Sequence, residues 1–400
     1  MGILTFLDKE NHKSIIKDEN IHILYDLLSD DNKSNEQFFQ NTIQDAKKDQ
    51  TKEVQKDIEA KLDKYKEVYI HAVSIISLLH VNFEDGHENC VAHYRTKKTS
   101  QKMLIRPRNK DGSATDKFNV STFQLGAINY SNDLTEGMTL LHYLFGKEKC
   151  PARTEVNQEY GAFASSFIFN PNCLNQFRLY GKEDAKEGTG VSLVFDNDFF
   201  SPSPKMATEP TEKEMAKRHA LYRCIYIDPE TQRVETVGHK EKHLFYQEYW
   251  ADKKKPKGTM LTEEEEQEVG EQFEEYRKYI EEVETLVKDK LKQLRESINN
   301  EELDHAIVGR LLINLRYLTK HIAFKEEQEC RIVRICSFVE EKDIKISEDF
   351  KRMYLEYLPI PKYVKKIYFG PKATEMEIFQ DMLKHEGLNI PCEQSEHPWA

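Results

Sequence analysis

The sequence contains no run of about 18 apolar residues, the length that a membrane-spanning helix needs, so no transmembrane helix is predicted. Its first residues, MGILTFLDKENHKS, hold a short apolar stretch with no basic segment and no small-residue cleavage pattern, which predicts no secretory signal. N-myristoylation at Gly2 favours Ser or Thr at the sixth position, which is Phe6 here. We therefore expect no membrane insertion.

Cysteine is sparse, odd in number and never arranged as CxxC. This spacing argues against a disulfide framework and against a zinc site, so no metal site is predicted. We expect reduced thiols, most of them small core residues. The seven are Cys90, Cys150, Cys173, Cys224, Cys330, Cys336 and Cys392.

Positive charge is in deficit, with 58 Lys and Arg against 70 Asp and Glu, a net charge of −12. A general nucleic-acid binder is disfavoured, because contact with phosphates needs clustered Lys and Arg. The 21 Phe and 19 Tyr suffice for a core. At 400 residues, the chain is expected to hold two modules or one domain with large insertions.

Two long segments have a helical pattern. Residues 35–79 are rich in Lys, Glu and Gln and contain neither Pro nor Gly. Residues 261–298 carry an apolar stripe that includes Val269, Tyr276 and Val283, behind Thr262 and a block of Glu that suits a helix N-terminus. A shorter helix is predicted near the C-terminus, with Gly387 as its stop and a polar tail after it.

Short β-like segments separate these helices at irregular spacing, which indicates a mixed sheet in an α+β protein and not a parallel doubly wound sheet. Residues 123–146 suggest a strand, a polar turn and a helix, with Asn132 or Asp133 as a possible cap. The other predicted strands lie in 90–97, 160–170, 188–196, 221–228, 329–338 and 364–371.

The predicted β module is split by helical sequence, so that five segments follow one another. They are an N-terminal helical region (1–88), the first part of the β core (89–230), a helical insertion (231–319), the second part of the core (320–372), and a C-terminal helix with a polar tail (373–400).

The stretch HIAFKEEQECRIVRI concentrates negative charge at the start of a predicted strand. Residues two apart on a strand share a face, so Glu327 and Glu329 are expected to project together, with Arg331 behind them. Paired carboxylates repel each other, and an enzyme accepts that cost where positive charge develops during the reaction. The alternatives are a solvated turn or a salt bridge from Glu329 to Arg331.

Two earlier segments carry further candidates. Arg95 follows Tyr94 near the end of a short strand, where a guanidinium suits a bidentate phosphate contact, or equally a surface ion pair. Ser165 and Ser166 interrupt an apolar strand, where hydroxyls could hold a ligand or could simply allow tight packing.

The order of these motifs, Arg on a first strand, Ser on a second and Glu-x-Glu at the start of a later one, resembles the mono-ADP-ribosyltransferases of the Arg-Ser-Glu, toxin-like class. In that class the Glu-x-Glu form goes with modification of arginine. The context FASSF, LNQFRLYG, GVSLVFD and KEEQECR also resembles an uncharacterised bacterial family, and some Legionella effector ADP-ribosyltransferases look similar. The resemblance covers the split β module.

The sequence departs from this pattern in two places. The second motif is ASSF where the toxin branch often has Ser-Thr-Ser. The first motif, HYRT, could also be aligned through His93 and Tyr94, as in the His-Tyr-Glu branch, which leaves the role of Arg95 open. Arg95 is preferred because Glu-x-Glu belongs to the Arg branch.

The resemblance implies an ADP-ribosyltransferase-like core and NAD as co-substrate. It implies that Glu329 hydrogen-bonds the ribose and stabilises an oxocarbenium-like cation, while Glu327 orients the acceptor guanidinium. Arg95 would hold the phosphates, and Ser165 or Ser166 would position Glu329 and the ribose. The implied NAD-binding set also includes Tyr94 and Phe167, the latter stacked on the nicotinamide.

The implied partner is a protein target of a host. The chain would be an effector that is made in the bacterial cytoplasm and acts, after export, in the host cytosol or a host organelle, with its helical segments recognising the target. Two alternatives stay open at this point: an NAD glycohydrolase, which uses water as acceptor, and a non-catalytic interaction protein with the same fold.

Overall fold

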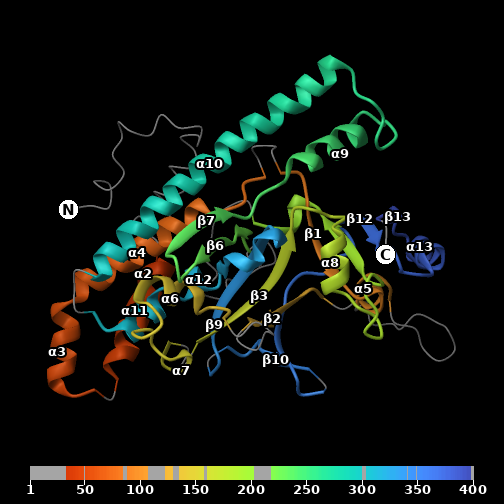
Figure 1. The fold of residues 1–400 in the computed structure, drawn as a ribbon. Helices are drawn as coiled ribbons and strands as arrows, with labels where there is room; N and C mark the ends of the chain where they lie inside the picture. Colours follow the sequence, from red (N-terminus) through yellow and green to blue (C-terminus); the bar gives the residue numbers. More distant parts are fainter. Residues whose placement is uncertain are drawn as a thin grey trace.

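The fold is known from a computed structural model, which describes residues 33–48, 50–83, 88–106, 122–128, 135–156, 160–201, 218–299, 303–339, 341–347 and 349–397; for residues 33–36 only the backbone is described. Helices and strands alternate irregularly along the chain (Figure 1). The protein is therefore α+β.

A large sheet of ten strands forms the centre of the molecule. Its strands pair in the order β10-β11-β2-β3-β1-β4-β12-β13, and β9 joins β3 on one edge and β5 on the other. Only β12 and β13 pair in parallel; the other pairs are antiparallel. These strands are β1 (Val91–Arg95), β2 (Gln124–Ala127), β3 (Tyr160–Ile168), β4 (Val191–Phe195), β5 (Tyr222–Arg223), β9 (Glu329–Ser337), β10 (Lys345–Ile346), β11 (Met353–Glu356), β12 (Val364–Phe369) and β13 (Cys392–Gln394).

A second, three-stranded sheet has the order β7-β6-β8. It consists of β6 (Ile225–Asp228), β7 (Arg233–Val237) and β8 (Thr319–His321). β6 is antiparallel to β7 and parallel to β8, so the protein combines both kinds of pairing. The mixed sheets expected from the irregular strand spacing are present.

The large sheet divides at β3. On one edge, β3 pairs with β9 along its whole length, from Tyr160↔Ser337 to Ile168↔Glu329. On the other edge β2 pairs at Ala164 and Phe163, whereas β1 pairs at Ile168. Between these contacts, residues 165–167 of β3 have no strand partner on that edge among the described residues. We call this opening between β1 and β2 the fork.

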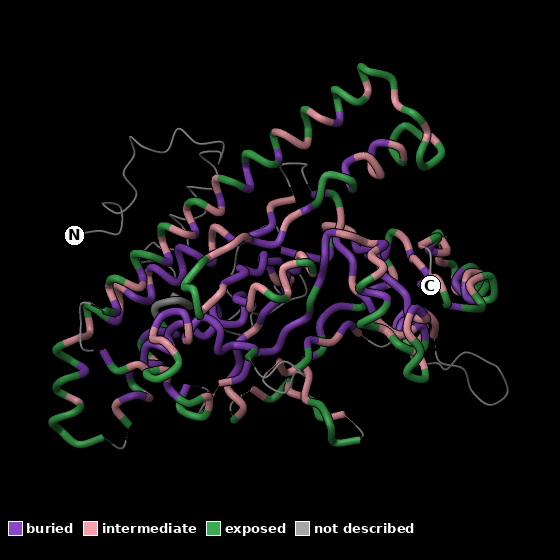
Figure 2. The backbone as a smooth tube through the Cα atoms, in the orientation of Figure 1, coloured by how far each residue is buried: buried purple, intermediate pink, exposed green. Residues whose placement is uncertain are grey.

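Helices from two parts of the chain that are far apart in the sequence cover one face of the sheet (Figure 1). α10 packs along α4, and both share a buried apolar cluster with α2, α11, α12, β3 and β9. The end of α10 near α9 extends away from the sheet and is largely exposed (Figures 1 and 2). The helices are α2 (Lys33–Lys47), α3 (Lys52–Ala60), α4 (Leu62–Leu78), α5 (Lys97–Leu104), α6 (Thr139–Phe145), α7 (Arg153–Val156), α8 (Leu174–Leu179), α9 (Lys242–Asp252), α10 (Glu263–Asn299), α11 (His305–Leu311), α12 (Ile313–Arg316) and α13 (Met376–His385).

The opposite face of the sheet carries a second core that is rich in aromatic rings. Phe123 stacks on Phe167 with ring centroids 5.6 Å apart, and Phe195 and Phe199 meet both rings. Aromatic pairs of this kind contribute beyond the area that they bury. These rings hold the two branches of the sheet together beside the fork.

Most segments predicted from the sequence occur as helices or strands, but some differ. The predicted strand 221–228 is two strands in different sheets, β5 and β6, and β7 lies within the segment predicted as a helical insertion. The long helical segment near the N-terminus is three helices, because Thr51 caps α3 and Lys61 leaves helical geometry between α3 and α4. The expected polar tail contains β13, which pairs with β12. Gly387 ends α13 with a φ of +79°, as expected. The possible caps Asn132 and Asp133 lie outside the described residues.

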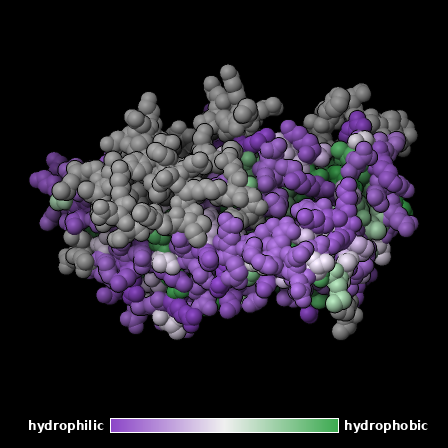
Figure 3. Space-filling model, turned by 90° about the horizontal axis from the view of Figure 1, so that it is seen from above, coloured by the Kyte–Doolittle hydropathy of each residue, from purple (hydrophilic) through white to green (hydrophobic). Residues whose placement is uncertain are grey.

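One face of the molecule is strongly polar where its residues are described (Figure 3). Outside the part drawn in grey, the face seen in Figure 3 is mostly hydrophilic, with small scattered apolar groups. Among the described residues, no helix has the length and apolar character needed to cross a membrane.

Three histidines are held neutral inside the fold. Burial lowers the pKa of His80 to about 4 and of His219 to about 4, and it lowers the pKa of His93 to about 3. His80 lies against Tyr222, and its buried Nε2 has no hydrogen-bond partner. The unfolded chain takes up protons on these rings below about pH 6.5, whereas the folded protein does not.

The free energy of unfolding is therefore expected to fall as the pH drops from about 6.5 towards 4, by up to about 1.4 kcal/mol per pH unit for each histidine. Urea unfolding at several pH values measures this slope. His80→Phe should make the slope shallower, and substitution of the exposed His385 by Phe is the control. Equal slopes for wild type and His80→Phe would contradict the assignment.

Candidate functional site

The candidate site begins where β9 begins. Glu329 is the first residue of β9 and is only 2% exposed. Its backbone N–H donates to the Tyr226 hydroxyl at 2.8 Å, and its carbonyl accepts from Cys224 N–H at 2.9 Å. Gly238 lies so close that a Cβ there would come within 2.3 Å of the Glu329 carbonyl oxygen. These contacts with Tyr226, Cys224 and Gly238 hold the first residue of β9 in place.

Glu327 does not lie on the strand, contrary to expectation. It ends the 3₁₀ helix η5 (Ile322–Glu327), and Gln328 then takes a left-handed conformation with φ +46°. The two carboxylates meet in another way, because both bind the ammonium of Lys320. Lys320 Nζ lies 2.6 Å from Glu329 Oε2 and also contacts Glu327 Oε2. Glu327 Oε1 accepts from the Tyr180 hydroxyl at 3.1 Å.

Charges of alternating sign continue inwards from this pair. Arg331 Nε donates to Glu329 Oε1 at 2.5 Å, so the salt bridge considered as an alternative is present. Arg331 Nη1 donates to the Tyr317 carbonyl at 2.8 Å and also contacts Glu136 Oε1. The series Glu327, Lys320, Glu329, Arg331 and Glu136 forms one buried network, which we call the charge chain.

The two carboxylates of the motif titrate in opposite directions. Burial raises the pKa of Glu327 above its ordinary value, and Lys320 only partly offsets this. Burial also opposes ionisation of Glu329, but Arg331 and Lys320 outweigh it and hold the pKa of Glu329 well below its ordinary range. Environments that push the pKa values of two neighbouring acids apart are typical of acid–base sites.

The strand register decides which candidates share a face with Glu329. Residues that pair directly project to the same side, so Glu329, Ile168 and Ala92 form one row across β9, β3 and β1. Arg331 and Ser166 form the next row. We call this side the Glu329 face.

Of the two serines, only Ser166 lies on the Glu329 face. It is exposed although its neighbours along β3 are buried. Its carbonyl accepts from His93 Nδ1 at 2.7 Å, which satisfies the β3 backbone inside the fork. Ser165 points to the other face and is buried. The structure thus separates two residues that the sequence left equivalent.

Arg95 is not brought to Glu329. Side chains alternate along β1, so Arg95 lies on the opposite face, with its guanidinium 5.1 Å from the centre of the Phe123 ring. It also contacts Met103 Sδ, and its buried Nε has no hydrogen-bond partner. No described carboxylate pairs with it. Burial and the nearby Arg352 lower the pKa of Arg95 to about 10.

The remaining candidates divide in the same way. Tyr94 lies on the Glu329 face, where its hydroxyl donates to the Asn170 carbonyl at 2.9 Å and accepts from Cys173 N–H at 2.7 Å. Phe167 lies on the other face, inside the aromatic core, and is fully buried. The Tyr94 hydroxyl thus stabilises the segment before α8, and the ring of Phe167 is not accessible to a ligand.

Sequence reasoning missed Lys320, Glu136 and Tyr180, whose side chains contact the motif residues. Lys320 lies seven residues before Glu327 on β8, and Glu136 comes from a distant segment before α6. Tyr180 follows α8 and reaches Glu327 from the solvent side. The burial of Lys320 and Glu136 is the signal that identifies them, and the sequence does not carry it.

Comparison with known proteins adds one match. Residues 176–332 match a family described as a protein of unknown function, DUF2971. The matched part covers less than half of the chain and runs from α8 into β9, so it contains Lys320, Glu327, Glu329 and Arg331 but neither β1 nor Ser166. No curated protein and no solved structure matches the chain.

Proposed function

We propose that this protein cleaves NAD at the bond between nicotinamide and ribose and transfers the ADP-ribosyl group to a protein side chain, arginine being the acceptor that the Glu-x-Glu motif favours. The observation that carries the proposal is the pair of carboxylates with opposite pKa shifts at the start of β9, beside the exposed Ser166 on β3.

The arrangement of the strands supports the same proposal. The three strands that bear the Arg, Ser and Glu-x-Glu motifs, β1, β3 and β9, are neighbours in one sheet. They are far apart in the sequence, so their adjacency is not a consequence of chain proximity. The sheet also divides beside Ser166, which leaves that hydroxyl accessible.

In the proposed reaction, the glycosidic C–N bond breaks and its electron pair leaves with nicotinamide. The acceptor nitrogen then forms the new bond to the ribose carbon and gives up a proton. Glu327 is suited to take that proton, because its carboxylate lies at the outer end of the charge chain and its pKa is raised. Glu329 stays ionised and provides the negative charge that stabilises an oxocarbenium-like ribose.

Both oxygens of Glu329 are occupied by cations, Arg331 on one and Lys320 on the other. In the proposal, Glu329 therefore acts on the ribose through its charge and through the position it gives to Lys320 and Glu327. The Arg95 guanidinium lies on the opposite face of the sheet from Glu329, so in the proposal it does not contact the phosphates of the same NAD molecule.

The test is incubation of the purified protein with labelled NAD, alone and with a eukaryotic cell lysate. Label is expected on a protein with wild type, with intact-mass spectrometry showing an added ADP-ribosyl group. Glu327→Gln should reduce labelling by about 100-fold or more, because it removes the base while keeping the shape of the side chain. Glu326→Gln is the matched control, since Glu326 is the exposed neighbour in the same 3₁₀ helix.

Each outcome separates the candidate functions. NAD consumption without a labelled protein would establish a glycohydrolase. If the protein neither binds nor turns over NAD, with or without lysate, the charge chain is a structural network in an interaction protein. Labelling that Glu327→Gln leaves unchanged would remove Glu327 from the chemistry.

A further inference from the structure

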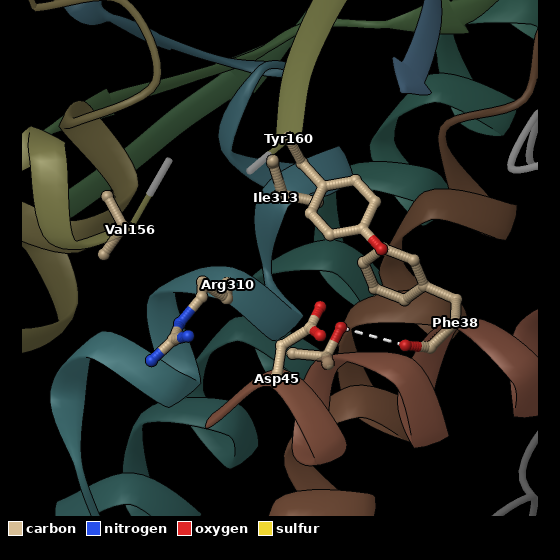
Figure 4. A pocket seen from close by; sticks show the side chains of 7 residues that line it. Phe38, Asp45, Val156, Tyr160, Arg310 and Ile313 are labelled. Atoms are coloured by element: carbon tan, nitrogen blue, oxygen red, sulfur yellow. Dashed lines mark hydrogen bonds between the residues drawn. The ribbon is translucent and has the colours of Figure 1, made fainter. Parts of the chain in front are cut away.

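A hollow outside the charge chain lies where α2 meets the start of β3 and the helices α7, α11 and α12 (Figure 4). Counted out to its open mouth, with the open solvent there included, it encloses about 430 Å³. It is lined by Phe38, Thr42, Asp45, Val156, Tyr160, Arg310 and Ile313. The proposed function uses none of these residues.

Arg310 brings a guanidinium to this hollow that forms no ion pair with any residue that the structure describes. Its Nε makes one long contact with the Ala306 carbonyl, at 3.4 Å, within its own helix. No described carboxylate forms an ion pair with its guanidinium. Arg334, which is also partly buried, is by contrast paired with Glu341. A half-buried guanidinium that forms no ion pair can bind an anion, and a carboxylate fits its two parallel N–H groups.

The other walls add one opposite charge and a large apolar area. Figure 4 shows the Asp45 carboxylate and the Arg310 guanidinium along the same side of the hollow, with the rings of Tyr160 and Phe38 on the other. These rings meet edge to face, 6.2 Å apart, and Val156 and Ile313 are buried beside the cavity. The Thr42 hydroxyl donates to the Phe38 carbonyl at 2.9 Å, so its oxygen can still accept.

We propose that this hollow is a binding site for a free amino acid with an apolar side chain. The ligand carboxylate binds the Arg310 guanidinium, and its ammonium group is held by Asp45 and the Thr42 oxygen. The side chain packs among Val156, Ile313 and the two rings. Only a ligand that combines both charges with an apolar body uses every wall of the site.

The test is isothermal titration calorimetry on the full chain, with leucine and phenylalanine as ligands. 4-Methylpentanoate and 3-phenylpropanoate lack the amino group, whereas 3-methylbutylamine and 2-phenylethylamine lack the carboxylate. At least one of the two amino acids is expected to bind, and each truncated analogue should bind about tenfold or more weakly than its parent.

Arg310→Met should weaken binding of the amino acid by about tenfold or more, and Arg310→Lys, which keeps the charge but loses the paired N–H groups, should weaken it less. The surface variant Arg233→Met is the matched control and should bind as wild type does. Urea unfolding of each variant shows whether it is folded. The proposal is overturned if neither amino acid binds at about 10 mM, if an analogue without the amino group binds equally well, or if folded Arg310→Met keeps wild-type affinity.

Discussion

Replacing Glu329 by Gln is expected to lower the free energy of unfolding by about 3 kcal/mol, because two buried cations lose the carboxylate that they share. A Gln side chain can accept a hydrogen bond from Lys320 or from Arg331, but its amide nitrogen then faces the other cation. Lys320 keeps Glu327 and Arg331 keeps Glu136, so the protein should still fold.

Urea unfolding at neutral pH measures this loss, with Glu326→Gln expected to stay within about 0.5 kcal/mol of wild type. The difference between wild type and Glu329→Gln should shrink in acid. The folded-state pKa of Glu329 is depressed, so its stabilisation is present above the unfolded value of about 4.3 and is lost as the pH falls below it. A difference that does not depend on pH would contradict the depressed pKa.

The same variant should reduce NAD cleavage by orders of magnitude, measured at a temperature and urea concentration where it is folded. Adding Lys320→Met to Glu329→Gln separates the effect on stability from the effect on the reaction. The double variant leaves no uncompensated Lys320 charge, so its loss in the free energy of unfolding should be smaller than the sum of the losses of the two single variants. Full activity of folded Glu329→Gln would remove Glu329 from the proposed reaction.

Replacing Arg223 by Met is expected to lower the free energy of unfolding by about 3–5 kcal/mol. Arg223 on β5 is fully buried and contacts Glu88 Oε1, and its Nη1 donates to the Gly238 carbonyl at 2.8 Å. Glu88 also accepts from the Tyr276 hydroxyl of α10 at 2.7 Å. These contacts connect α10 to the large sheet, so losing them leaves a buried carboxylate with one neutral donor.

Urea unfolding of three variants tests this assignment. Glu88→Gln alone should also destabilise, while the double variant Glu88→Gln, Arg223→Met should lose less than the sum of the two single losses, because no buried charge then stays unpaired. Arg233→Met is the control, since Arg233 is 68% exposed and pairs only with Glu235 at the surface. A loss below about 1 kcal/mol for Arg223→Met would show that the pair does not hold α10 in place.

The repeat patterns of the sequence determined most of the secondary structure. The apolar stripe of α10 follows from how a helix buries one side, and the nearly continuous apolar runs of β9 and β3 suit strands that are buried on both faces; both patterns are local properties. Two breaks in the N-terminal helical segment were not predicted, because neither Gly nor Pro marks them.

The candidate site was only partly accessible to the same reasoning. The sequence singled out Glu327, Glu329 and Ser166, but it placed Glu327 on the strand, whereas the left-handed Gln328 puts it on η5. It grouped Arg95 with Glu329, whereas the register of β1, β3 and β9 puts them on opposite faces. A register is set by pairing between distant segments, and a shift of one residue would exchange the faces.

The sequence by itself determined which segments are helices and strands and that carboxylates gather at the start of β9, since both depend on neighbours along the chain. Only the tertiary structure decided what those carboxylates contact. Lys320 comes from β8 and Glu136 from 195 residues before Arg331, and they meet because burial of charge in one core requires partners of opposite sign.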